Sequence, residues 1–272
     1  MRYSKAYDNA KFLKSPQGRT IRILSEFLEP SQRFRKEGIR NTIVVFGSAR
    51  LHSKAEARKQ LRIVKKKVGT KKRLSPRDKE ELQKASIAFT MSQYYEDAVK
   101  LTAMLSRWSK TLKAEHQFAI CSGGGPGIME AANKGAKSVR GKSVGLNISL
   151  PFEQTSNLFI SKNLGFEFHY FFMRKFWFVY LAKAMIMFPG GFGTLDELME
   201  VLTLLQTKKV KKPLPMVLYG SQYWNEIINF ESMVKYQTIS LHDRHLFRFA
   251  DTPEEAFNYL KESLITLYHS KK

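Results

Sequence analysis

Two glycine-rich loops, each placed between a short apolar segment and a helical pattern, restrict the folds open to this chain. The first loop, SGGGPG at 122–127, follows the apolar segment 118–121, and the second, PGGFGT at 189–194, follows the apolar segment 184–188. Glycine permits close approach of the backbone to a ligand and adopts positive φ without strain. In a parallel α/β sheet such loops lie at the carboxyl ends of the strands, where helix N-termini meet anions. We therefore expect a parallel sheet that binds a phosphate at this edge.

Short apolar segments alternate with helical patterns along most of the chain. Further strands are predicted at 42–46, which closes on Gly47 and Ser48, and at 143–148, 166–168 and 215–218. Apolar residues at helical spacing predict helices over 21–28, 88–108, 128–136, 195–206, 223–230 and 253–268. This alternation predicts an α/β fold, a Rossmann-like doubly wound parallel sheet with helices on both faces.

Composition and length favour one globular unit. The 272 residues are 43% hydrophobic and 26% charged, which is typical of a chain that buries a large core. No internal repeat or low-complexity linker interrupts it, so we expect a single domain over 1–272 with a basic helical N-terminal extension (1–40) and a basic insertion (51–85). No segment reads as a signal peptide or membrane span, and Cys121 is the single cysteine. We expect a cytoplasmic protein with no membrane partner.

The net charge of +22 is concentrated near the N-terminus. Residues 1–85 hold 24 Lys and Arg against 8 Asp and Glu, whereas 86–272 hold 22 against 16. A basic run is usually a solvated helix face or a mobile loop, and nucleic-acid binding through 51–85 is the alternative. The segment 51–88 holds no Phe, Tyr or Trp for stacking on bases, and the chain has no recognised nucleic-acid motif. Nucleic-acid binding is therefore possible but not favoured.

The second loop carries polar residues suited to one phosphate. Thr194 is predicted to be the N-cap of the following helix, with Asp196 and Glu197 in its first turn. The loop lacks the Lys-Ser/Thr pair of a P-loop, so we expect backbone N–H groups to hold the phosphate without Mg²⁺. No cluster of His, Cys, Asp or Glu has metal-ligand spacing, and we expect neither a metal nor a cofactor.

Residues 189–197, PGGFGTLDE, resemble the PGGxGTxxE signature of the LOG family, which is named for cytokinin-activating phosphoribohydrolases and whose members have carried the label lysine decarboxylase. Four further blocks are similar to family segments: VFGSAR at 45–50, the loop and helix at 122–136, GLNI with PFEQ at 145–154, and FFMRK at 171–175. The resemblance covers about residues 41–220. It implies a Rossmann-like fold and a homodimer or higher homo-oligomer.

The resemblance also implies an activity, the hydrolysis of the N-glycosidic bond of a nucleoside 5′-monophosphate to free base and ribose 5-phosphate. An AMP-like substrate would make the protein an AMP nucleosidase, and a cytokinin riboside 5′-monophosphate would place it in cytokinin biosynthesis. Arg174 and Glu197 match the family's essential arginine and glutamate and are the expected catalytic residues. The expected substrate-binding residues are Glu153, Lys175, Gly190, Gly191, Phe192, Gly193, Thr194, Thr203, Gly123, Gly124, Gly125, Gly47 and Ser48.

Glycosidic cleavage passes through an oxocarbenium-like state, which calls for negative charge near the ribose, a water and help for the departing base. We expect Glu197 to orient the sugar, to stabilise positive charge or to activate water. Arg174 is expected either to bind the phosphate or to hydrogen-bond the leaving base. The alternative is a non-catalytic carrier of a nucleotide or of the molybdenum cofactor with the same fold.

Overall fold

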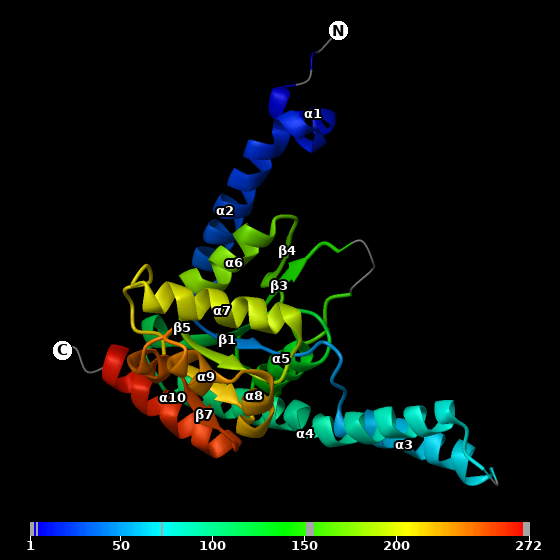
Figure 1. Cartoon of the computed structure of the whole chain (residues 1–272). Coiled ribbons are helices and arrows are strands. Elements are labelled where there is room, and N and C mark those ends of the chain that lie inside the picture. The colour runs from blue at the N-terminus through cyan, green and yellow to red at the C-terminus, as the bar shows by residue number, and fades with distance from the viewer. Residues whose placement is uncertain (1–2, 4, 72, 151–154, 269–272) are drawn as a thin grey trace.

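The computed structural model describes residues 3, 5–71, 73–150 and 155–268, and within them a seven-stranded sheet is the centre of the molecule (Figure 1). All neighbouring strands pair in parallel, in the order β4-β3-β2-β1-β5-β6-β7. The strands are β1 (Asn41–Phe46), β2 (Phe118–Ser122), β3 (Ser143–Ile148), β4 (Gly165–Phe168), β5 (Ala182–Met187), β6 (Met216–Tyr219) and β7 (Arg248–Ala250). Every strand predicted from the sequence is present, and the doubly wound parallel sheet is confirmed.

Helices cover both faces of the sheet, because successive strand residues point to opposite sides and both sets are apolar. One face packs against α2 (Arg19–Lys36), α6 (Phe171–Tyr180), α7 (Phe192–Gln206), α8 (Ser221–Ile227) and α9 (Phe230–Lys235). The other face packs against α4 (Pro76–Ser109), α5 (Ile128–Ser138) and α10 (Pro253–Tyr268). Two further helices, α1 (Ala10–Lys14) and α3 (Lys54–Gly69), lie outside these layers (Figure 1).

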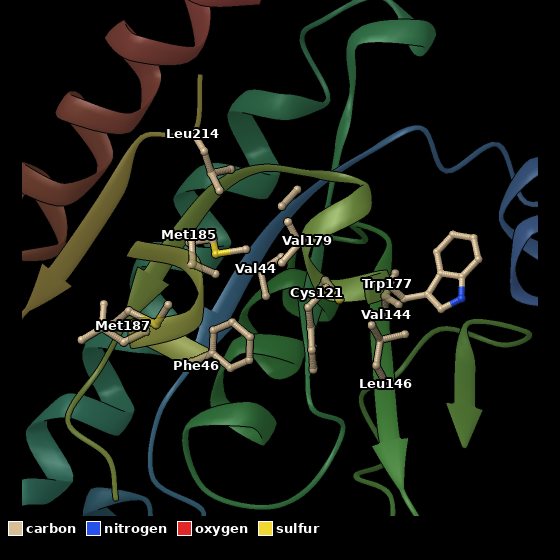
Figure 2. Close-up of a cluster of buried hydrophobic side chains, with 14 of the residues drawn as sticks. Val44, Phe46, Cys121, Val144, Leu146, Trp177, Val179, Met185, Met187 and Leu214 are labelled. Carbon is tan, nitrogen blue, oxygen red and sulfur yellow. The ribbon is translucent and has the colours of Figure 1, made fainter. Parts of the chain in front are cut away.

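The core on the α6 and α7 face is built from alternate strand residues. Figure 2 shows Val44 and Phe46 of β1 beside Cys121 of β2 and Met185 and Met187 of β5, all of them buried. Cys121 is thus a core residue whose burial raises the pKa of its thiol. The intervening residues of the same strands, such as Ile43 and Ile186, enter the core of the opposite face.

Strand order reverses beside β1, and this reversal creates the binding edge. The chain passes from β1 through β2 and β3 to β4 on one side, then returns to place β5 on the other side of β1. The loops that follow β1 and β5 therefore lie side by side, and the Ser48 backbone N–H donates to the Pro189 carbonyl at 2.9 Å. In doubly wound sheets ligands bind in the crevice at this reversal.

The helix after the second glycine loop begins earlier than the sequence predicts. Helix α7 starts at Phe192 with Gly191 as its N-cap, so the prediction of Thr194 as N-cap is wrong. Thr194 lies within the first turn, where its N–H donates to the Gly191 carbonyl at 3.0 Å. Asp196 and Glu197 consequently fall in the second turn, and no acid occupies the first. The extended backbone at Gly191 permits this early start, which brings Glu197 inward rather than to the solvated helix end.

The basic insertion folds as a helical hairpin. Helix α3 and the N-terminal part of α4 run side by side and project from the sheet (Figure 1). The predicted helix 88–108 thus begins twelve residues earlier, at Pro76, because Ser75 caps it through a reciprocal pair with Asp78. The prediction of one helix over 223–230 is wrong, because α8 ends at Ile227 and α9 begins at Phe230. The sequence did not predict α3, α6 or β7. None of the helices in the described part of the chain is both long and apolar enough to cross a bilayer.

The predicted N-terminal extension is helical and is joined to the body of the protein through β4, where Arg33 donates to the Gly165 carbonyl at 2.8 Å, and through α6. Helix α2 matches the predicted helix 21–28 and ends before Gly38, as expected. The Glu26 carboxylate of α2 accepts from the backbone N–H groups of His169, at 2.8 Å, and Tyr170, at 3.3 Å, at the start of α6. The Trp177 indole N–H donates back to the Glu26 carbonyl at 2.9 Å. The division of 1–272 into one domain with two elaborations stays a prediction.

Candidate functional site

A cavity of about 840 Å³ lies at the carboxyl ends of β1, β2, β3 and β5. It is bounded by the three loops that follow β1, β2 and β5, by the starts of α6 and α7, and by side chains from α4, α5 and α8. The expected residues that line it are Gly47, Ser48, Gly123, Arg174, Gly190, Gly191, Phe192, Gly193, Thr194 and Glu197. Residues far apart in the sequence thus meet at the predicted edge.

The loop 189–194 presents backbone donors to the cavity. Thr194 and Leu195 both donate to the Gly191 carbonyl at 3.0 Å, which leaves the N–H groups of Phe192 and Gly193 without an acceptor inside the helix. The Gly190 backbone lies so close to Thr194 that a Cβ at position 190 would be 2.1 Å from the Thr194 Oγ1. A Cβ at Gly191 or Gly193 would meet nothing within 4 Å, so these positions are open on the ligand side. The loop is suited to a single anion.

The loop after β2 is fixed by a buried polar network. The Asn157 amide donates to the carbonyls of Gly124 and Gly125, each at 3.0 Å, and to the Asn133 Oδ1 at 2.9 Å. Gly124 has φ +75°, and a Cβ there would lie 2.5 Å from the Asn147 Oδ1, so a larger residue is excluded. Gly123 alone of the three expected glycines lines the cavity, whereas Gly124 and Gly125 lie behind it as structural positions.

Arg174 lies in the cavity wall. Its Nε donates to the Leu146 carbonyl at the end of β3 at 2.7 Å, and its guanidinium is 5.0 Å from the centre of the Phe178 ring. A Cβ on Gly123 would be 2.6 Å from the Arg174 Nη2, so only glycine leaves room for this side chain. Burial lowers the pKa of Arg174, and the charge of Glu197 opposes that shift. The guanidinium remains a cation at neutral pH.

Glu197 is a buried acid in the same wall, and its residue is 5% exposed. Its Oε2 is enclosed and makes no hydrogen bond within the described residues. Burial raises the pKa of Glu197 to about 7, against the opposing charges of Lys175 and Arg174. A carboxyl group with this pKa exchanges a proton near neutral pH, which suits a general acid or base.

Lys175 is not among the residues that line the cavity, and it bridges two acids of α7, of which Asp196 does line it. Its Nζ is 2.8 Å from Asp196 and 2.6 Å from Glu200, which flank Glu197 along the helix. Although burial opposes the change, these hydrogen bonds raise the pKa of Lys175. The structure therefore places Lys175 as a link between α6 and α7, while Arg174, its neighbour in sequence, reaches the cavity.

Thr203 is a further expected residue that does not line the cavity. Thr203 is exposed two turns beyond Glu197 on α7, and its hydroxyl donates to the Met199 carbonyl at 2.7 Å. Glu153 lies outside the described residues. Within those residues no group of three or more His, Cys, Asp or Glu is arranged to hold a metal ion.

Several cavity residues were missed as candidates, among them Asn147, Tyr223 and Met91. Asn147 is the penultimate residue of β3 and donates to the Phe166 carbonyl at 3.0 Å, and its polar side chain near the end of an apolar strand was a usable signal. Tyr223 of α8 donates through its hydroxyl to the Gly190 carbonyl at 2.8 Å, bracing the loop from a distant helix. Met91 comes from α4. No local pattern marks Tyr223 or Met91, because only the sheet topology brings α8 and α4 to this edge.

Comparison with known proteins agrees with the motifs. Residues 129–260 match the model of the family described as "Possible lysine decarboxylase". The chain is 36% identical over 81 residues to the probable cytokinin riboside 5′-monophosphate phosphoribohydrolase LOGL6 of Oryza sativa subsp. japonica. It is 35% identical over 82 residues to the cytokinin riboside 5′-monophosphate phosphoribohydrolase LOG4 of Arabidopsis thaliana. The resemblance to the LOG family is confirmed.

The LOG matches cover 29% and 30% of this chain and 32% and 38% of those two relatives, so the aligned part spans about a third of each relative's length. Two solved structures match the chain at low identity. The structural-genomics target TM1055 is 19% identical, with a TM-score of 0.48 over 82% of this chain and 99% of its own. The molybdenum cofactor binding protein of Rippkaea orientalis is 18% identical, with a TM-score of 0.45 over 62% of this chain and 86% of its own.

Proposed function

We propose that this LOG-family chain hydrolyses the N-glycosidic bond of nucleoside 5′-monophosphates, releasing a free base and ribose 5-phosphate. The observation that carries the proposal is the buried Glu197, whose Oε2 has no partner among the described residues and whose pKa is about 7, in the same cavity wall as Arg174 and the 189–194 loop. An unpaired buried carboxylate destabilises a folded protein, and such groups concentrate at reactive sites.

The proposed binding mode places the 5′-phosphate on the first-turn N–H groups of α7. The donors at Phe192 and Gly193 and the helix dipole favour an anion there. A phosphate at the start of α7 leaves the ribose near Glu197 in the second turn, since successive turns are separated by about 5.4 Å. The remaining cavity, lined by Met91, Met129 and Tyr223, would receive the base.

The proposed reaction uses the Glu197 carboxylate, which faces the ribose, to stabilise positive charge and to accept a proton. As the bond from C1′ to the base nitrogen breaks, positive charge develops on the sugar ring and a carboxylate stabilises it. Water adds to C1′ and gives its proton to Glu197, while the bonding electron pair leaves with the base, which takes up a proton. Arg174 holds its position through the Leu146 carbonyl and offers its remaining N–H groups to the phosphate or to the departing base.

A panel of purine and pyrimidine nucleoside monophosphates, including AMP and a cytokinin riboside 5′-monophosphate, tests the proposal by chromatographic detection of free base. We expect base release by the wild type and a loss of at least about 100-fold in Glu197→Ala and Arg174→Ala. Glu262→Gln, at an exposed glutamate of α10, is the matched control and should retain full activity. Absence of base release from every monophosphate would leave the non-catalytic carrier as the better description.

We further propose that the chain works as a homodimer or larger homo-oligomer. Helices α2 and α6 expose large apolar side chains on neighbouring surfaces, including Leu24, Leu28, Phe172 and Tyr180. The ring centres of Phe27 of α2 and Phe176 of α6 are 5.5 Å apart, which connects the two surfaces. Light scattering measures the mass of the assembly, which should fall in the variants Leu24→Asp and Leu28→Asp. An unchanged mass would argue against these helices as the interface.

A further inference from the structure

The projecting hairpin of α3 and α4 carries a row of unpaired cations that the proposed hydrolase reaction does not use. Residues 54–84 hold 13 Lys and Arg against 4 Asp and Glu. Figure 1 shows that this hairpin extends away from the sheet. None of the described residues within 54–84 lines the cavity, so these cations lie outside the proposed hydrolase site.

The charges of α3 are sorted by face. Five exposed cations lie within an arc of about 120° of the helix, given 3.6 residues per turn. They are Arg58, Lys59, Arg62, Lys65 and Lys66, here called the α3 basic row. The residues Ala57 and Val68, on the opposite side, are buried against α4. The basic row is therefore continuous and faces outward from the hairpin.

Three acids of the hairpin form ion pairs with lysines outside the α3 basic row. Glu81 and Asp78 of α4 pair with Lys67 at 2.7 Å and with Lys71 at 2.6 Å, across the contact between the two helices. Glu80 pairs with Lys84 on α4 itself. No ion pair is formed by the α3 basic row with any described residue. The Arg58 guanidinium lies 5.9 Å from the centre of the Phe89 ring of α4, and the row as a whole is exposed to solvent.

We propose that the α3 basic row binds the phosphate backbone of double-stranded nucleic acid without sequence preference. The row extends over about 12 Å at 1.5 Å per residue, a length over which a duplex carries about seven phosphate charges. Contacts from Lys and Arg to phosphates give affinity and orientation but read no bases. Residues 51–88 contain no Phe, Tyr or Trp, so the hairpin lacks the stacking side chains that single strands require.

The same geometry disfavours an acidic membrane surface as the partner. A helix that enters the interface of a membrane presents an apolar face beside its cations. The apolar face of α3 is occupied by α4, and Ile63 is the large apolar side chain that α3 leaves exposed. A duplex needs only the row of cations.

Fluorescence anisotropy with a labelled duplex of about 20 base pairs tests the proposal. Five phosphate contacts predict a slope of about −4.5 for log K against log salt, or an affinity loss of roughly 500-fold between 50 and 200 mM salt. Replacing all five cations of the α3 basic row by glutamine should weaken binding at 50 mM salt by at least about 100-fold. Melting temperature and base release from nucleotides should be unchanged in this variant.

A second five-site variant distinguishes the contribution of the α3 basic row from the effect of the net charge of the protein. Glutamine at the exposed cations Lys113, Lys162, Lys208, Lys209 and Lys235 removes the same net charge from other surfaces. This control should keep the salt slope and stay within about tenfold of the wild-type affinity. An equal loss in both variants, no duplex binding by the wild type, tighter binding to a single strand, or binding only to phosphatidylserine vesicles would overturn the proposal.

Discussion

Replacing Glu197 by glutamine should stabilise the folded protein at alkaline pH while it abolishes base release. The carboxyl group is enclosed, and burial raises its pKa to about 7 from an ordinary value of 4.5. A raised pKa means that the folded state favours the protonated form. The stabilisation from this proton is complete below the unfolded pKa and is lost as pH rises through the folded pKa.

The size of the effect follows from the shift. Moving the pKa from 4.5 to about 7 corresponds to about 3 kcal/mol of stability lost between pH 4.5 and pH 8, at about 1.4 kcal/mol per unit. Glutamine has no charge to bury, but its amide must occupy the same unpaired position, which costs about 1 to 2 kcal/mol. We therefore expect Glu197→Gln to be more stable than wild type by about 1 to 2 kcal/mol at pH 8, and less stable or equal at pH 5.

Urea unfolding of both proteins at pH 5, 6, 7 and 8, followed by circular dichroism, measures the difference. The informative quantity is the change with pH of the wild-type minus variant free energy of unfolding. Glu262→Gln, at an exposed glutamate, is the matched control for the same change of side chain at the surface. The reasoning fails if the Glu197→Gln difference is the same at pH 5 and pH 8, because Glu197 would then titrate alike in the folded and unfolded chain.

Two further predictions concern the loop and the hairpin. Gly190→Ala should destabilise the protein by at least about 2 kcal/mol, because its Cβ would lie 2.1 Å from the Thr194 Oγ1, whereas Gly193→Ala should fold normally and lose activity by crowding the ligand. Thermal melting and base release measure both, and a stable, active Gly190→Ala would contradict the loop geometry. Asp78→Ala should accelerate amide hydrogen exchange in 65–85 but not in the sheet, since hydrogen bonds from Lys71 hold the pKa of that carboxyl well below its usual range. Lowering the pH below the usual pKa range of an aspartate should also accelerate exchange in the hairpin of the wild type. Unchanged exchange in the variant and in the wild type at low pH would show that the ion pair of Lys71 with Asp78 does not stabilise the turn between α3 and α4.

Local sequence was sufficient where a structure depends on contacts close along the chain. Alternating short apolar segments with helical patterns predicted the parallel sheet, because strands buried on both faces are apolar throughout. The signature at 189–197 predicted the cavity loop, since a close backbone approach admits only small residues. The prediction of Thr194 as N-cap failed because the backbone is extended at Gly191 and turns into the helix directly after it. The helix therefore starts three residues earlier than the preference of threonine for cap positions predicts.

The sequence by itself determined the fold class and the two glycine loops, and its resemblance to a family signature predicted Arg174 and Glu197 as catalytic residues. The tertiary structure decided which charged side chains are buried, which form ion pairs and which are exposed to solvent. It placed Lys175 between Asp196 and Glu200, left Thr203 on the surface, and enclosed Glu197 so that its pKa reaches about 7. In the basic insertion, it placed Lys67 and Lys71 in ion pairs with α4 and left the α3 basic row without ion pairs. Burial and charge pairing depend on elements distant in the chain, and no local pattern contains that information.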